Sequence, residues 1–146
     1  MKFICLDVGT KRIGVASCDA LEIAASPLSV IPADKKAPST VAGLIEREFA
    51  SGVVVGLPLS TDGTERESCK MVRDFIAKLK PLLKVPIETF DERFTTKIAE
   101  ASLIEAGMRR EKRRDIRDAV SASLILQSFL DLRRNTRNKA EPTQQE

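Results

Sequence analysis

Hydrophobic and polar positions alternate at the start of the chain, as they do in β-strands. Residues 2–8 and 13–18 form two such segments joined by the turn residues 9–12, which predicts a hairpin with a glycine turn. A third extended segment, residues 23–31, contains Pro27, which suits a strand at the edge of a sheet because proline has no backbone N–H to donate. We therefore expect the chain to begin with three antiparallel strands.

Helical spacing begins near residue 40 and predicts a helix that ends near Gly52. Its inward face is Val41, Leu44, Ile45 and Phe49. The continuous apolar run 53–58 then predicts a parallel strand that is buried on both faces. Thr64 and Glu67 have the spacing of a capping box and predict a second helix, which Pro81 stops. The inward face of that helix is Val72, Phe75, Ile76 and Leu79.

The second half of the chain predicts a further strand over residues 85–90 and a helix over 96–106 that is closed by a glycine. The segment 116–132 is apolar over much of a helix circumference, so it predicts a final helix packed into the body. We expect a disordered polar and basic tail over 133–146. The whole pattern predicts one α/β domain over residues 1–132, with a mixed sheet, right-handed crossovers and flanking helices.

Composition excludes several classes of enzyme. The 146 residues include no His, Tyr or Trp, so imidazole bases, histidine metal ligands and tyrosyl nucleophiles are ruled out. Asp and Glu together number 21, and carboxylate chemistry on phosphate generally uses a hard metal ion. Three cysteines without a C-x-x-C pair, and no apolar run long enough to span a bilayer, predict a cytoplasmic protein with no membrane partner.

The net charge of +3 is distributed unevenly along the chain. Residues 109–118 hold six basic and three acidic side chains, and residues 133–146 hold four basic and two acidic ones. Basic charge on both sides of the last helix is typical of a nucleic-acid partner, while a solvated face with a solubilising tail is the simpler explanation. The arginines of this region that we expect to contact phosphates are Arg109, Arg110, Arg113, Arg114 and Arg117.

Acidic residues stand where strands end and where the last helix begins. Asp7 lies among apolar residues, so it either binds a cation or caps the turn that follows it. Asp91 and Glu92 directly follow a strand, and alternation allows only one of them to face a site shared with Asp7. A surface ion pair with Arg93 is the other explanation for this triplet. Asp118 begins a small, apolar face of the last helix.

These acids can meet at the carboxyl ends of the strands, where α/β sheets form their sites. Carboxylates in this arrangement predict a site for one or two Mg²⁺ or Mn²⁺ ions, which activate water and stabilise the leaving oxygen in phosphodiester hydrolysis. We expect phosphate contacts from Lys11 and Arg12, from the turn over residues 56–58, and from residues 62–64 at a helix N-terminus.

Four ordered motifs closely resemble the YqgF/RuvX family and span residues 1–132. They are Asp7-x-Gly9-x-x-Arg12-Ile13-Gly14-Val15-Ala16, then Gly56-Leu57-Pro58 with Asp62-Gly63-Thr64, then Asp91-Glu92-Arg93 with Thr95-Thr96, and Asp118-Ala119 with Ile125-Leu126-Gln127. The resemblance implies an RNase H-like fold with a five-stranded sheet of order 3-2-1-4-5. It also implies a bacterial cytosolic nuclease that matures the 5′ end of pre-16S rRNA, or in some members resolves Holliday junctions.

The resemblance assigns roles to single residues. Asp7, Glu92 and Asp118 are the implied catalytic and metal-binding acids, with Asp91 as the alternative to Glu92. Arg12 and Arg93 are implied to contact phosphate or to hold the acids. The residues expected to serve backbone geometry are Gly9, Gly14, Gly56, Pro58 and Gly63.

The last of the four motifs departs from the family pattern. Arg117 precedes Asp118 where a hydrophobic residue is expected, and serines at 121 and 123 interrupt the expected paired alanines. The arginine adds a candidate phosphate contact, and the serines weaken the prediction that this helix face is buried.

Three functions are compatible with these patterns. The first is a metal-dependent endonuclease on precursor rRNA or branched DNA, for which a homodimer would allow two symmetric cuts. The second is an ATP-binding domain, because residues 7–10 also resemble the first phosphate loop of the sugar-kinase and actin superfamily, although those proteins close two domains around the nucleotide. The third is a nucleic-acid-binding factor with little or no catalysis that uses the basic segments. Without Trp or Tyr, we expect recognition to depend on Lys, Arg and backbone amides.

Overall fold

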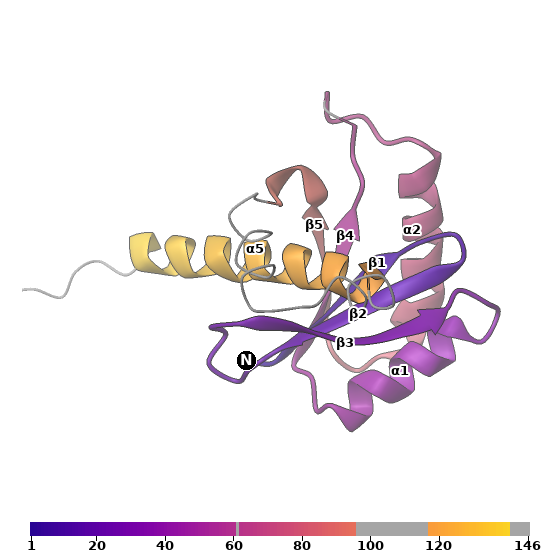
Figure 1. The fold of residues 1–146 in the computed structure, drawn as a ribbon, viewed down its shortest axis with the longest axis horizontal. Coiled ribbons are helices and arrows are strands. Elements are labelled where there is room, and N and C mark those ends of the chain that lie inside the picture. The colour runs from indigo at the N-terminus through magenta and orange to yellow at the C-terminus, as the bar shows by residue number, and fades with distance from the viewer. Residues whose placement is uncertain (61, 96–116, 141–146) are drawn as a thin grey trace, which may run out of the picture.

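A five-stranded mixed sheet forms the centre of the computed structural model, which describes residues 1–60, 62–95 and 117–140 (Figure 1). The strands β1 (Phe3–Val8), β2 (Arg12–Cys18) and β3 (Ala25–Pro32) pair antiparallel. The strands β4 (Gly52–Leu57) and β5 (Ile87–Asp91) extend the sheet in parallel on the other side of β1. The resulting order, β3-β2-β1-β4-β5, confirms the predicted topology.

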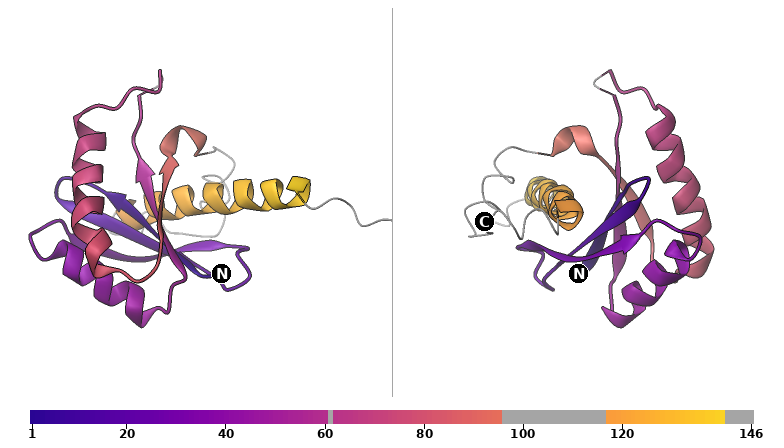
Figure 2. Two further views of the ribbon diagram at one scale, coloured as in Figure 1. Left: turned by 180° about the vertical axis from the view of Figure 1, so that it is seen from behind. Right: turned by 45° about the vertical axis from the view of Figure 1, so that its right-hand side comes forward.

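Helices cover both faces of this sheet. The helices α1 (Ala37–Arg47) and α2 (Glu67–Leu79) lie on one face, and α5 (Arg117–Ala140) crosses the other (Figure 2). Two short 3₁₀ helices, η1 (Lys80–Leu82) and η2 (Glu92–Phe94), follow α2 and β5. Among the described residues, no helix is long and apolar enough to cross a membrane.

The sheet separates two hydrophobic cores, one on each face, and β1 contributes to both. Ile4, Leu6 and Val8 belong to the core beneath α1 and α2, whereas Phe3 and Cys5 belong to the core beneath α5. This alternation follows from the period of two along a strand. It directs Asp7, the next residue of the second series, to the α5 face.

The edge position predicted for the third strand is confirmed. In the described sheet β3 pairs only with β2, and Pro27 lies opposite Ala16, next to a shift in the register. A proline at this place removes no hydrogen bond from a central ladder.

Two predicted helix boundaries are wrong. Helix α1 ends at Arg47, and Phe49 follows it with a positive φ of 53° and a side chain that is 87% exposed, so Phe49 does not belong to the inward face. Thr64 does not cap α2, because its hydroxyl and backbone N–H both donate to Asp62 and the helix begins only at Glu67.

The last helix is longer than predicted. We expected it to end at residue 132 and a disordered tail to follow, but α5 continues to Ala140. Arg133 donates to the carboxylate of Glu22, whose side chain is only 7% exposed, and Arg134 donates to the backbone carbonyl of Glu22. These bonds hold the segment against the β2–β3 connection, so its helical state has a physical cause. Residues 141–146 and the helix predicted over 96–106 lie outside the described residues.

Candidate active site

Asp7 lies between two glycines in the sheet. The register of β1 and β2 pairs Asp7 with Gly14, and the register of β1 and β4, which pairs Leu6 with Val55, continues to place Asp7 level with Gly56. Neither neighbour has a side chain, so the sheet leaves space on both sides of the Asp7 carboxylate. Other parts of the chain fill this space.

Gly14 allows the first turn of α5 to rest directly on β2. A Cβ atom on Gly14 would lie 1.9 Å from the backbone oxygen of Asp118 and 2.9 Å from the nitrogen of Ala119. No side chain fits at that distance, because these are backbone atoms that cannot turn aside. The glycine therefore brings Asp118 to the row of the sheet that holds Asp7.

Gly56 gives space to Glu92 in the same way. A Cβ atom on Gly56 would lie 3.1 Å from Cγ of Glu92 and 2.9 Å from Cδ1 of Ile125. The Glu92 side chain thus lies over the backbone of β4, on the face that α5 covers. Gly14 and Gly56 together explain how acids from β1, η2 and α5 reach the same face of the sheet.

The end of β5 separates the two neighbouring acids Asp91 and Glu92. The Asp91 carboxylate accepts a hydrogen bond from the backbone N–H of Arg93 at 2.9 Å, which begins η2. It also accepts bonds from the Arg93 guanidinium at 2.5–3.0 Å. Glu92 lies instead beside Gly56, near Asp7.

Burial and mutual repulsion raise the pKa values of Asp7 and Glu92. Burial raises the pKa of Asp7 to about 6, and the charge of Asp118 adds to the effect. Burial raises the pKa of Glu92 to about 7, with further contributions from Asp7 and Asp91. The pKa of Cys5 is raised in the same region, first by burial and then by Asp7 and Glu92. In the part of the chain that the structure describes, Asp7 and Glu92 therefore lack the nearby positive charge that would lower their pKa values.

Hard oxygen ligands with raised pKa values are the donor set that suits Mg²⁺ or Mn²⁺, because a divalent cation offsets both their desolvation and their repulsion. Within the described part of the chain, no three His, Cys, Asp or Glu side chains lie close enough together to hold one ion. Asp118 accepts a hydrogen bond from Arg12 instead, with 2.8 Å between Nε and Oδ2.

The basic and turn residues predicted near the site lie at the same edge of the sheet. Lys11 and Arg12 are exposed in and after the β1–β2 turn, which Gly9 closes by donating to the Arg12 carbonyl at 2.9 Å. Gly63 has a φ of 86° and lies close to the Arg93 guanidinium. Pro58 is half-buried directly after β4.

Several predicted phosphate contacts cannot be placed. Arg109, Arg110, Arg113 and Arg114 lie outside the described residues. Arg117 is the first residue of α5, and its side chain also lies outside them.

The structure explains two residues of the last motif. Gln127 joins α5 to the edge of the sheet, because its side chain accepts from the N–H of Ala25 at 3.0 Å and donates to the carbonyl of Ile23 at 3.2 Å. Ser123 is fully buried and donates to the carbonyl of Ala119 at 3.0 Å, so it fits where an alanine was expected.

Sequence reasoning missed the ion pair between the buried side chain of Glu22 and the half-buried side chain of Arg133. The only local signal was an acid at the start of an extended, largely apolar segment. Its partner lies far along the chain.

A family model described as "RuvX: Holliday junction resolvase" matches residues 1–132 of the chain. The chain belongs to the RuvX family. One relative of this RuvX protein is a protein of Endomicrobium trichonymphae named "Putative pre-16S rRNA nuclease". The two sequences are 44% identical over 130 residues, which are 87% of this chain and 93% of the relative. A protein of the same name from Syntrophus aciditrophicus (strain SB) is 40% identical over 133 residues, covering 90% and 89% of the two chains.

Solved structures of resolvases share the fold of this RuvX protein. The structure titled "T. thermophilus RuvC in complex with Holliday junction substrate" matches with a TM-score of 0.62 at 15% identity, over 93% of this chain and 97% of that chain. A fowlpox virus resolvase with its junction DNA matches with a TM-score of 0.51 at 14% identity, over 97% and 100%. The RNase H-like fold is thus confirmed, and the family favours a nuclease over an ATP-binding domain.

Proposed function

We propose that this RuvX family protein is a metal-dependent endonuclease that processes the 5′ end of pre-16S rRNA in the bacterial cytoplasm. The observation that carries the proposal is that Asp7, Glu92 and Asp118 come from three distant segments to the α5 face of the sheet, where the charge of Asp118 acts on Asp7 and the charge of Asp7 acts on Glu92. The names of the relatives support pre-16S rRNA as the substrate.

The three acids are the residues that would hold one or two Mg²⁺ or Mn²⁺ ions. When bound, the metal supplies an activated water and compensates the charge on the leaving oxygen. Asp7 and Glu92 provide half-buried carboxylates whose raised pKa values fall when a cation is near. Arg12 orients the third carboxylate through its bond to Oδ2 of Asp118.

The neighbouring arginines and lysines position the phosphate backbone. Asp91 fixes the guanidinium of Arg93 beside residues 62–64, and Lys11 and Arg12 stand on the other side of Asp7. Cations at these places contact phosphates without reading the bases, so they set the register of the strand. The arginines over 109–117 would extend this contact along the substrate.

Holliday junctions are the second candidate substrate, because the matching family model carries that description and the chain shares its fold with junction-bound resolvases. Resolution of a junction needs two cuts related by symmetry. A homodimer of this chain would provide them.

A comparison of two labelled substrates tests the proposal. The full chain is incubated with a precursor RNA that extends beyond the mature 5′ end and with a four-way DNA junction, each with Mg²⁺, Mn²⁺ or chelator. We expect metal-dependent cleavage of the RNA that is lost in Asp7→Asn. Faster cleavage of the junction would assign the protein to recombination instead. If neither substrate were cleaved, the nuclease function would be wrong and the protein would be a nucleic-acid-binding factor.

A further inference from the structure

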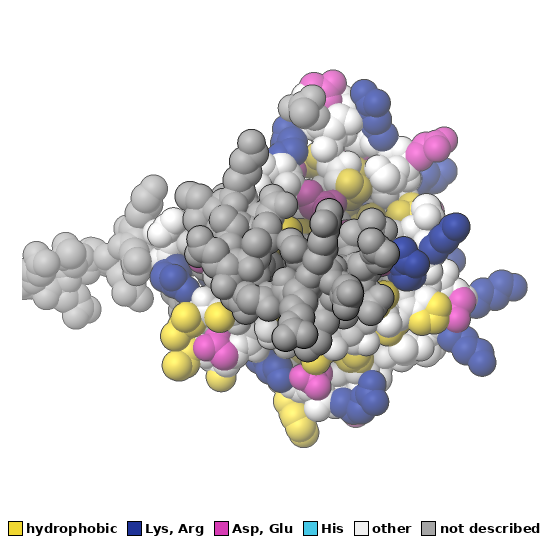
Figure 3. Space-filling model, viewed as in Figure 1, with side chains coloured by type: hydrophobic (Ala, Val, Ile, Leu, Met, Phe, Trp, Pro, Cys, Tyr) yellow, Lys and Arg dark blue, Asp and Glu magenta, His cyan; other side chains and the backbone are white. Residues whose placement is uncertain are grey.

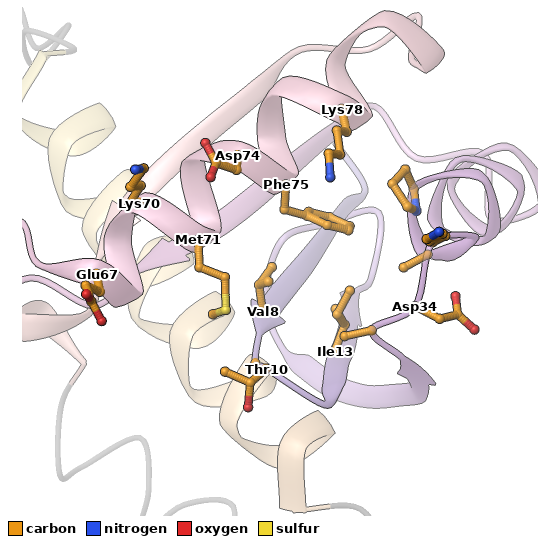
Figure 4. A pocket seen from close by; sticks show the side chains of 15 residues that line it. Val8, Thr10, Ile13, Asp34, Glu67, Lys70, Met71, Asp74, Phe75 and Lys78 are labelled. Atoms are coloured by element: carbon orange, nitrogen blue, oxygen red, sulfur yellow. The ribbon is translucent and has the colours of Figure 1, made fainter.

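A concave surface lies at the same edge of the sheet as the acids, but on the opposite face. It is a pocket of about 490 Å³ between the β1–β2 turn, the β3–α1 connection and α2 (Figure 4). None of Asp7, Glu92 and Asp118 lines it. Its volume is typical of pockets that hold a small organic group.

The inner walls of the pocket are apolar and include one aromatic ring. Figure 4 shows Met71 and Phe75 extending from α2 toward Val8 and Ile13, which close the pocket on the side of the sheet. Val8 and Ile13 are buried in the core, while Met71 and Phe75 are only partly buried. A phenyl ring and a thioether that border an open space suit a flat, polarisable group.

The rim of the pocket is charged with both signs. Lys35 and Lys78 are exposed and form no ion pair with any residue that the structure describes, and Figure 4 shows Lys78 on the same side of α2 as Phe75. The acids Asp34, Glu67 and Asp74 line the same rim. Acids disfavour a simple anion such as free phosphate. A nucleotide suits this rim because it combines a phosphate with a flat ring that carries N–H donors.

The pocket and the acid cluster lie on the two sides of one short turn. Asp7 and Val8 are consecutive residues of β1 that face opposite sides of the sheet, and Gly9 and Thr10 of the next turn line the pocket. Figure 3 shows basic side chains along this border of the molecule, over the region of α1, α2 and the β1–β2 turn. A strand held at the acids by its phosphates would have only this turn to cross before reaching the mouth of the pocket.

We propose that the pocket receives one unpaired base of the nucleic-acid strand that is bound at the acids. The base lies against Phe75 and Met71, and its phosphate lies beside Lys78. The inference rests on the proposed nuclease function. It gives the protein a way to distinguish unpaired from paired strands without Trp or Tyr, since single-stranded RNA is recognised through bases that are splayed out onto aromatic side chains.

Photo-crosslinking and binding of a short single-stranded RNA that carries one 5-iodouridine test the proposal. The Asp7→Asn protein, which we expect to leave the RNA uncut, should crosslink through Phe75 or Met71. In the same background, Phe75→Leu should weaken binding by about fivefold or more, as loss of a base–aromatic stack does. Lys78→Gln should weaken binding as well, and it serves as a second variant because an exposed lysine does not affect folding. Crosslinks outside the pocket, or unchanged affinity in both variants, would overturn the proposal.

Matched variants and a competitor complete the experiment. Phe49→Leu and Lys80→Gln make the same chemical changes at exposed positions outside the pocket, and they should bind the RNA like the parent protein. Excess AMP or UMP should compete only weakly; a mononucleotide that binds as tightly as the RNA would assign the pocket to a free nucleotide and overturn its link to the strand.

Cleavage by the otherwise unmodified chain separates this proposal from the nuclease assignment. Phe75→Leu should raise KM for precursor RNA by about fivefold with kcat retained. Cleavage with an unchanged KM would overturn the pocket proposal alone. If the chain cut no substrate, the nuclease function would fail, while the crosslink and the affinity loss would still report on the pocket.

Discussion

The missing side chains of Gly14 and Gly56 let the backbone of Asp118 and the side chain of Glu92 pack against the face of the sheet that carries Asp7. The motifs of the sequence indicated that these glycines matter for backbone geometry. They did not indicate which residues approach them, since those partners lie far away in the chain. Long-range contact of this kind is invisible to local patterns.

Gly14→Ala should disrupt the site and destabilise the protein. Its Cβ would lie 1.9 Å from a backbone oxygen of α5, so the helix must move. We expect a loss of about 3 kcal/mol or more in the free energy of unfolding, measured by urea denaturation, and loss of cleavage.

Gly43→Ala is the matched control for this change. Gly43 lies in α1, and a Cβ there meets nothing within 4 Å, so alanine should gain up to about 1 kcal/mol. Equal effects of the two substitutions would contradict the close approach of α5 to β2.

Asp7 should make the metal-free protein less stable as the pH rises. Its pKa rises from 3.8 to about 6 on folding, so the folded state binds the proton more tightly than the unfolded state. The contribution of Asp7 is therefore fully present below about pH 4 and is lost as the pH rises through about 6. The free energy of unfolding of wild type, minus that of Asp7→Asn, should fall by up to about 3 kcal/mol across this window.

Denaturation of both proteins at a series of pH values in chelator checks this sign. Glu46→Gln, an exposed change on α1, should leave the pH dependence of wild type unaltered. A difference between wild type and Asp7→Asn that rises with pH would mean that Asp7 is stabilised as an anion by a group of the protein.

Asp91 and Glu92 show where residue patterns reach their limit. Alternation predicted that only one of them faces Asp7, but not which one. The choice depends on where β5 ends, and Asp91 decides this by accepting the Arg93 N–H that begins η2. A competing local hydrogen bond also defeated the predicted capping box, since Thr64 donates to Asp62.

At the scale of the elements, helix α5 links three distant parts of the chain. Its first turn rests on Gly14, Gln127 bonds the start of β3, and Arg133 bonds the buried carboxylate of Glu22. Arg133 also lies over the ring of Phe3, 5.1 Å from its centre. The polar composition of the segment beyond residue 132 predicted disorder. Composition could not reveal that Glu22, far away in the sequence, bonds this segment.

Deletion of residues 133–146 should destabilise the protein by about 1–3 kcal/mol, because it leaves the Glu22 carboxylate with fewer partners in a buried place. Deletion of residues 141–146 alone should change the free energy of unfolding by less than about 0.5 kcal/mol. Thermal or urea denaturation measures both. Equal stability of the two truncated chains would show that the helical extension contributes nothing.

At the scale of the whole molecule, the sheet separates two surfaces along one edge. The acids lie on the α5 face, and the pocket bordered by Phe75 lies on the face of α1 and α2. Hydrophobic periodicity was sufficient to predict five strands and most of the buried helix faces, and Pro27 indicated that β3 lies at an edge of the sheet. The full strand order came from the family resemblance, because periodicity carries no information on which strands are neighbours.

Binding of Mn²⁺ by calorimetry tests the central claim most directly, because it requires no knowledge of the substrate. Asp7→Asn and Glu92→Gln should each weaken Mn²⁺ binding by about a hundredfold or more. This loss is larger than the one expected for a residue that only supports a metal ligand. Asp91→Asn and the exposed control Glu46→Gln should bind like wild type. Wild-type affinity in Asp7→Asn and Glu92→Gln would contradict a metal centre built from these acids.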